Sequence, residues 1–149
     1  MKIAVMLHVL GVVVWVGGMF FAYLALRPAA AKLLEPRQRL PLWSETLTRF
    51  FTWVWVSVAL VLGSGFYMIS VIAEEGRLPA YVHGMLYIGI TMTLIFGYVF
   101  SAPFTALKRA VAGENWPAGG AALNQIRIAV AVNLTLGLVN IVLATLGAA

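Results

Sequence analysis

The stretch Ile3–Leu26 reads IAVMLHVLGVVVWVGGMFFAYLAL and carries no charged side chain over its whole length. An α-helix needs about 20 predominantly apolar residues to cross the hydrocarbon core of a bilayer. The segment meets that length and lacks the two-residue alternation that is typical of a β-barrel strand. It predicts a membrane-spanning helix. We expect it to be retained rather than cleaved as a signal peptide, because its basic leader is only Lys2 and its apolar run is too long.

Three further stretches have the same character, and Arg49 and Arg127 are the only charges inside them. The whole chain of 149 residues is 62% hydrophobic and 10% charged. Soluble domains are roughly 45–50% apolar and about 25% charged, so this composition excludes a water-soluble globule. The sequence predicts one all-α domain, a bundle of four transmembrane helices with approximate limits 3–26, 47–73, 80–107 and 121–146.

The basic residues indicate how the bundle is oriented. They concentrate in the first and third of the predicted loops, which lie on the same side of the membrane: Arg27, Lys32, Arg37 and Arg39, then Lys108 and Arg109. The positive-inside rule places these loops in the cytoplasm and both termini on the outer, periplasmic side. We therefore expect a multi-pass protein of the bacterial inner membrane. Its net charge of +5 favours contact with membrane lipid rather than with nucleic acid.

The first loop is long for a connection within a helix bundle. Its segment 29–34 is expected to extend the first helix beyond the bilayer. The following segment, 38–45, is expected to lie flat at the membrane interface, with Trp43 anchored among the lipid headgroups. The simplest role for this loop is a basic tether on anionic lipid.

Few chemical groups are available for a functional site. The chain has no cysteine, which excludes disulfides, zinc–thiolate sites, iron–sulfur clusters and thiol nucleophiles, and it has only two histidines, His8 and His83. No phosphate-binding loop, dinucleotide fingerprint or zinc-protease motif is present. Any site built on imidazole must therefore use His8, His83 or both, and no catalytic residue can be named.

The two histidines are expected at one depth in the membrane. His8 lies roughly 7–8 Å, and His83 roughly 4–5 Å, inside the outer end of its helix at 1.5 Å per residue. Two imidazoles facing each other across a bundle can hold the iron of one haem on its two axial sides, so this pair predicts a bis-histidine haem b near the outer face. Taken singly, each ring is better explained by a hydrogen bond to a neighbouring helix.

Residues expected at the same level suit such a haem. Gly11 and Gly65 would open a flat slot, Tyr81 would wall it, Arg77 would bind a propionate, and Asn140 would orient a ligand histidine. Each has a simpler explanation: small-residue helix packing for the glycines, the interfacial aromatic belt for the tyrosine, and a solvated charge or an interhelical hydrogen bond for the other two.

Copper is the alternative metal. Met6, Met68 and Met85 also fall near the outer level, and thioether with imidazole is a suitable ligand set for Cu(I). Met6 and Met85 each lie two residues from a histidine, a helical spacing that turns them away from it. Methionine as a flexible apolar filler is the simpler explanation of all three.

Several short motifs resemble a known superfamily. The segment 8–19, HVLGVVVWVGGM, resembles the first helix of the copper resistance protein D superfamily and of the related membrane protoporphyrinogen oxidases. Arg49-Phe50-Phe51 with the later Gly63-Ser64-Gly65 resembles the superfamily's second helix, and the segment 81–86, YVHGML, resembles the third helix of the oxidases. The resemblance implies b-type haem on His8 and His83 for the oxidase branch. For the other branch it implies copper tolerance or uptake across the inner membrane. Met85 stands where the oxidase motif has lysine.

Two functions follow as expectations. The main one is a cytochrome-b-like protein that performs electron transfer or haem-dependent redox chemistry, with a quinone or a redox protein as its partner. The alternative is a copper-handling protein that uses His and Met ligands in resistance or uptake. A structural subunit without any cofactor is a third interpretation. The small-residue helix faces are compatible with a homodimer.

Overall fold

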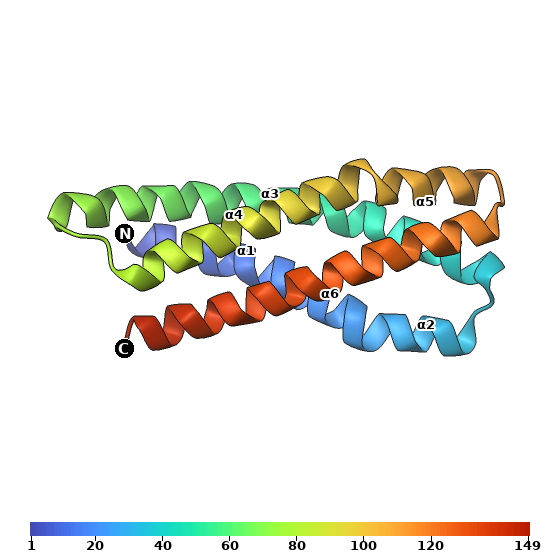
Figure 1. The fold of residues 1–149 in the computed structure, drawn as a ribbon, viewed down its shortest axis with the longest axis horizontal. Helices are drawn as coiled ribbons and strands as arrows, with labels where there is room; N and C mark the ends of the chain where they lie inside the picture. Colours follow the sequence, from blue (N-terminus) through green and yellow to red (C-terminus); the bar gives the residue numbers. More distant parts are fainter.

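Helices account for nearly all of the chain. The computed structural model describes residues 1–149 and contains no strand; its seven consecutive elements are α1 (Lys2–Phe21), the π-helical turn η1 (Ala22–Leu26), α2 (Arg27–Leu33), α3 (Pro36–Glu75), α4 (Ala80–Ser101), α5 (Pro103–Ala112) and α6 (Trp116–Gly147). Figure 1 shows them as one elongated bundle with both termini at the same end. We name that end the histidine end, because α1 and α4 begin there, and the opposite end the basic end.

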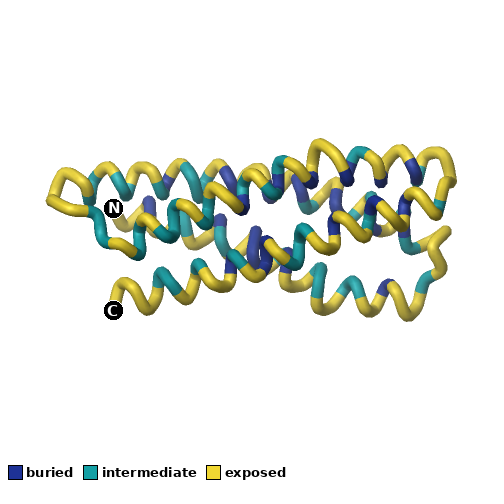
Figure 2. Tube along the Cα trace, in the orientation of Figure 1, coloured by how far each residue is buried: buried dark blue, intermediate teal, exposed yellow.

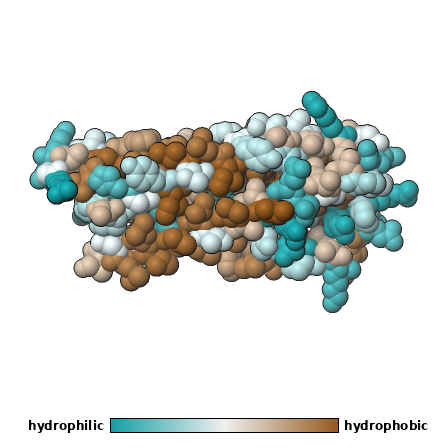
Figure 3. Space-filling view, viewed as in Figure 1, coloured by the Kyte–Doolittle hydropathy of each residue, from teal (hydrophilic) through white to brown (hydrophobic).

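Four helical rods are long and apolar enough to cross a membrane: Lys2–Leu33, Pro36–Glu75, Ala80–Ala112 and Trp116–Gly147. The predicted four-helix membrane fold is confirmed in this sense, and the chain is a multi-pass membrane protein. Each rod exceeds the roughly 20 residues that a bilayer requires, so its ends extend beyond the hydrocarbon region. The surface in Figure 3 agrees, since apolar residues form a broad band and hydrophilic residues gather at the basic end.

The third rod is broken where the sequence predicted one helix over 80–107. Ala102 leaves helical geometry, with φ −113° and ψ −79°, and Pro103 starts α5. Proline has no N–H group to donate, and it disfavours the helical conformation of the residue before it. The predicted single helix is therefore two, with the break at the Ala102–Pro103 step.

The first loop is largely helical. The expected extension of the first helix over 29–34 is confirmed, because α2 continues to Leu33. The expected flat interfacial segment over 38–45 is wrong: α3 already begins at Pro36, and Trp43 is only 6% exposed. Leu40, Trp43 and Leu47 repeat at helical spacing and are buried on one face. That apolar face packs against the bundle instead of lying among headgroups.

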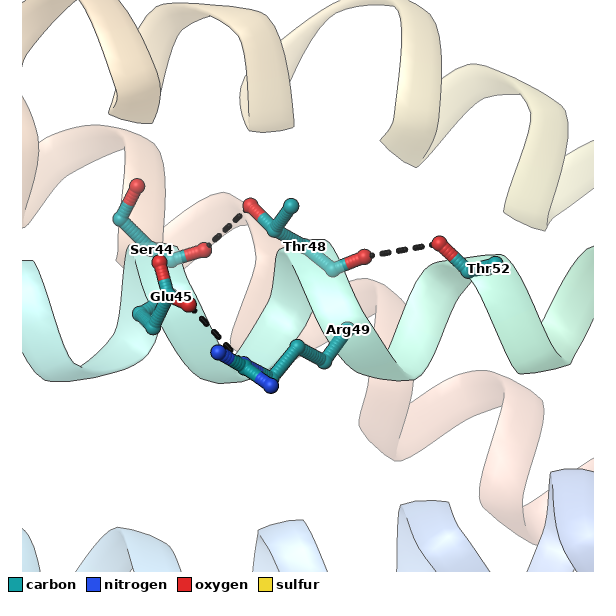
Figure 4. A network of polar contacts seen from close by, with 5 residues as sticks. All are labelled: Ser44, Glu45, Thr48, Arg49 and Thr52. Carbon is teal, nitrogen blue, oxygen red and sulfur yellow. Dashed lines mark hydrogen bonds and ion pairs between the residues drawn. The ribbon is translucent and has the colours of Figure 1, made fainter.

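The third to fifth turns of α3 carry a polar face (Figure 4). Thr48 Oγ1 donates to the carbonyl of Ser44 at 2.7 Å, and Thr52 Oγ1 donates to that of Thr48 at 3.1 Å. Arg49 Nε donates to Glu45 Oε1 at 2.9 Å, in an exposed ion pair between residues four apart. Such exposed pairs contribute about 0.3–0.5 kcal/mol to folding stability, so this pair stabilises the fold only weakly. It shows that this face of α3 is exposed to solvent.

The most buried residues lie from the middle of the bundle towards the basic end (Figure 2). Phe51 is the centre of an aromatic cluster: its ring centroid lies 5.2 Å from that of Phe96 and 4.9 Å from that of Phe104, both edge to face. Edge-to-face pairs add about 0.5–1.5 kcal/mol each beyond the apolar area they bury. This cluster fastens α3, α4 and α5 together.

Glycines allow the helices to pack closely in pairs. A Cβ atom at Gly11 would lie 2.7 Å from Val61 Cγ2, so α1 and α3 approach closely there. At Gly84 of α4 a Cβ atom would lie 2.9 Å from Leu143 Cδ2 of α6. The bundle is therefore built mainly from an α1–α3 pair and an α4–α6 pair.

Replacing Gly11 by leucine tests the first pair. We expect Gly11→Leu to lower the free energy of unfolding by about 1–3 kcal/mol, because the new side chain overlaps Val61 and the carbonyl of Ser57. Gly17→Leu, on the same helix with no atom within 4 Å of its Cβ position, is the matched control and should leave stability unchanged. Thermal unfolding in detergent, followed by circular dichroism, measures both. Equal melting temperatures for the two variants would contradict this packing.

Candidate metal-binding site

His8 lies on α1 and faces α3. Its Nδ1 is 3.0 Å from the Oγ atom of Ser64, which is buried, while the imidazole itself is half-buried. Gly65, the next residue of α3, leaves room for the ring: a Cβ atom there would lie 3.4 Å from His8 Cε1. The small-residue segment at 63–65 thus receives the imidazole.

The hydrogen bonds around Ser64 define the tautomer of His8. The Ser64 hydroxyl donates to the carbonyl of Leu60, one helical turn earlier, so it has only lone pairs to offer the imidazole. His8 Nδ1 must therefore carry the proton and donate it to Ser64. The lone pair of a neutral ring in this tautomer is on Nε2, which is the arrangement of a metal-binding histidine whose other nitrogen is held by an acceptor.

His83 is held in the same tautomer by a different partner. Its Nδ1 lies 3.2 Å from the carbonyl oxygen of Pro79, at the start of α4, and the side chain is exposed. A carbonyl only accepts hydrogen bonds, so in the neutral ring Nδ1 is the donor and the lone pair is on Nε2. In their neutral forms, both histidines of the chain therefore have the lone pair on Nε2.

The two imidazoles are not joined to each other. Both belong to the first turns of helices that start at the histidine end (Figure 1), but His8 bonds to α3 and His83 bonds to its own helix. The helices α1 and α4 do not form one of the bundle's packed pairs. The slot expected beside Gly11 is filled by Val61, so this arrangement gives the haem interpretation no support.

The other predicted site residues have separate places. Tyr81 packs against Gly147 near the end of α6, where a Cβ atom would meet its ring at 2.6 Å. Arg77 is exposed in the connection between α3 and α4. Asn140 donates from Nδ2 to the carbonyl of Met85 at 3.3 Å, and so links α6 to α4 rather than orienting a histidine.

The three candidate methionines differ in their surroundings. Met6 is 52% exposed on α1. Met85 lies on α4, and its own backbone carbonyl accepts from Asn140 Nδ2. Met68 is half-buried and lies four residues after Ser64, on the same face of α3. Met68 is therefore the one that shares a helix face with the hydrogen-bond partner of His8.

The chain contains no group of three or more His, Cys, Asp or Glu side chains arranged to hold a metal ion. Besides the exposed carboxylates of Glu74 and Glu75, the histidine end offers imidazole nitrogen and thioether sulfur. Imidazole and thioether suit a soft ion of low coordination number.

Comparison with known proteins gives one result. No curated protein and no solved structure matches the chain. The copper resistance protein D family matches residues 44–146, from the third turn of α3 almost to the end of α6. That range includes Ser64, Met68 and His83, whereas His8 precedes it. As the match covers more than half of the chain, the protein belongs to the copper resistance protein D family.

Proposed function

We propose that this protein binds copper in the membrane, as Cu(I), with Nε2 of His8 as the principal ligand. The observation that supports this most is the hydrogen bond from His8 Nδ1 to Ser64, since it leaves Nε2 unprotonated in a protein of the copper resistance D family. Copper handling, in resistance or uptake, is the function that fits this donor.

Met68 is the second ligand in this proposal. Helical side chains lean towards the N-terminus of their own helix, so His8 leans towards the histidine end. Met68 lies about 6 Å further towards that end than Ser64, at 1.5 Å per residue, and on the same face. An imidazole and a thioether from two packed helices form the soft, low-coordinate site that Cu(I) prefers.

His83 supplies a separate imidazole at the same end of the bundle. It is exposed, and its Nε2 is free while Nδ1 is held by Pro79. We propose that it serves as a surface ligand through which copper reaches or leaves the half-buried His8. Because His83 and His8 each supply only one imidazole, the copper ion would pass from one to the other by ligand exchange and would not be held too tightly at either.

The orientation of the protein is part of the proposal. The basic end, with the cations of α2 and α5, faces the cytoplasm and the histidine end faces the periplasm of a bacterial inner membrane. We expect alkaline phosphatase fused to the C-terminus to be active, because that enzyme folds only outside the cytoplasm. The same enzyme inserted after Gly113 should be inactive. The reverse pattern of activities would contradict the orientation.

Replacing Ser64 tests the role of the tautomer. We expect Ser64→Ala to weaken Cu(I) binding about 10–100-fold, which is the usual cost of removing the group that orients a ligand histidine. Ser70→Ala is the matched control, because Ser70 bonds only to the carbonyl of Tyr67 on its own helix. Competition with a Cu(I) chelator in detergent measures both. An unchanged affinity in Ser64→Ala would argue against the proposal.

The same preparation distinguishes copper from haem. The protein as purified from cells should show no Soret band and should bind added Cu(I). A Soret band with about one iron per chain, lost in His8→Ala, would instead establish the cytochrome-b-like function and overturn the copper proposal.

A further inference from the structure

A cavity of about 280 Å³ lies in the basic half of the bundle, far from the two histidines. Its walls come from α1, η1 and α2 on one side and from α3, α4 and α6 on the other. Along α6 it extends from the level of Gly120 to that of Asn133, a rise of about 20 Å. Its size approaches that of typical small-molecule sites.

The path of the first rod, Lys2–Leu33, keeps this cavity open. The π-helical turn Ala22–Leu26 interrupts α-helical geometry, and α2 then continues without packing against α5 or α6. Figure 1 shows α2 diverging from α6 at the basic end. Single π-helical turns inside α-helices are rare and frequently lie at functional sites. Here Ala22 and Tyr23 of the turn form part of the cavity wall.

The cavity has an apolar region and a basic region. Its interior is apolar and rich in aromatic rings, including Trp15, Trp43 and Phe96. Three arginines line it, Arg27, Arg39 and Arg127, and no acidic residue does. An amphiphile with an apolar chain and an anionic head would complement both regions.

The arginines carry charges that the protein does not neutralise. Arg27 Nε donates to the carbonyl of Tyr23, Arg39 Nη1 to that of Leu34, and Arg127 Nη2 to the amide oxygen of Asn124. All three acceptors are uncharged, and the ion pair of the chain, between Arg49 and Glu45, lies elsewhere. Each guanidinium uses one donor in these bonds and keeps several for a ligand.

We propose that the cavity binds one anionic phospholipid, with its phosphate among Arg27, Arg39 and Arg127 and one acyl chain in the aromatic interior. Guanidinium groups bind phosphate oxygens through paired hydrogen bonds. Basic pockets between membrane helices recognise anionic headgroups in this way. Because the cavity lies within membrane-spanning helices and α2 does not close it against α6, the lipid enters sideways from the bilayer.

The charge part of the proposal is tested with two triple variants of equal net charge. Delipidated protein is mixed with equal amounts of phosphatidylglycerol and phosphatidylcholine of the same chain length, and native mass spectrometry counts the lipids retained. The wild type should retain one phosphatidylglycerol per chain with at least a tenfold preference. Neutralising the cavity arginines should reduce this retention at least tenfold: Arg27→Gln, Arg39→Gln and Arg127→Gln. The control should retain it: Arg37→Gln, Lys108→Gln and Arg109→Gln, which are exposed and outside the cavity.

A second variant tests whether the lipid occupies the cavity itself. Gly120 lines the cavity, and a Cβ atom there would meet nothing within 4 Å, so Gly120→Phe fills space without a clash. It should reduce phosphatidylglycerol retention at least tenfold with every arginine present, whereas Gly17→Phe should not. Equal loss in both triple variants, full retention in Gly120→Phe, or co-purification of a tightly held molecule other than a phospholipid would overturn the assignment.

Discussion

His8→Ala should reduce the affinity for Cu(I) by at least about 100-fold, because it removes the one ligand that the bundle both orients and half-buries. Loss of a group that only orients a ligand typically costs 10–100-fold, and loss of the ligand itself should cost no less. The side chain contacts Ser64 and the edge of Gly65, so the substitution leaves the main α1–α3 packing at Gly11 in place. The measurement is chelator competition in detergent, with circular dichroism to establish that the variant is folded.

Three further variants define what this result means. Met6→Leu removes a thioether that is 52% exposed on the same helix, and should leave the affinity unchanged. Met68→Leu should weaken binding by an intermediate amount and keep the apolar volume. His83→Ala should leave the tight site intact while slowing the exchange of copper with the solution. Wild-type affinity in His8→Ala would show that copper, if bound, is bound elsewhere.

Asn133→Asp should destabilise the protein by about 3 kcal/mol. Asn133 is 3% exposed, and its Nδ2 donates to the carbonyl of Met92 at 3.0 Å, joining α6 to α4 near the middle of the bundle. Aspartate loses that donor and sets a carboxylate beside a carbonyl oxygen. The cost of an acidic side chain at the centre of a membrane helix is about 2.5–3.5 kcal/mol.

Asn124→Asp is the matched control on the same helix. Asn124 is exposed, and its Oδ1 already accepts from Arg127 Nη2 at 2.7 Å, so the added negative charge meets a guanidinium. This variant should be as stable as the wild type. Thermal unfolding of both variants in one detergent measures the difference. A melting temperature for Asn133→Asp equal to that of Asn124→Asp would contradict the role of Asn133 in the α4–α6 pair.

The transmembrane organisation was predictable because it depends on composition along the chain. Four apolar runs of bilayer length require helices wherever their neighbours lie. The two breaks in the first and third rods each lie next to a proline. Pro103 follows Ala102 directly, and Pro28 lies two residues after the π-helical turn Ala22–Leu26, where it has no N–H group to donate to the carbonyl of Leu24.

The segment around Trp43 shows why local pattern is insufficient near a membrane surface. Tryptophan between basic residues is typical of an interfacial anchor, but it equally suits one face of a helix. Residues that are distant in sequence and pack against this segment decide between the interfacial anchor and the buried helix face. Leu40, on the same face, packs against α6 at Gly119, where a Cβ atom would lie 2.9 Å from its Cδ1. Tertiary packing thus turned the expected surface segment into the start of a 40-residue helix.

The candidate site was only partly predictable. The sequence singled out the two histidines by rarity, and their helices do begin at one end of the bundle. The partner of His8 was missed, although Ser64 lay within the noted Gly-Ser-Gly segment. Antiparallel helices place residues of equal depth side by side, and that comparison could have paired His8 with Ser64. Close contacts between the helices, such as Gly11 with Val61, decide which face of α1 turns towards α3. No local sequence pattern predicts this orientation.

X-ray absorption at the copper K-edge of protein loaded with one Cu(I) per chain tests the central claim most directly. We predict a low-coordinate Cu(I) centre with imidazole nitrogen and one sulfur ligand, and the loss of the imidazole scattering in His8→Ala. A spectrum without imidazole scattering, or one that is identical in the wild type and His8→Ala, would contradict the assignment of His8 Nε2 as the copper ligand.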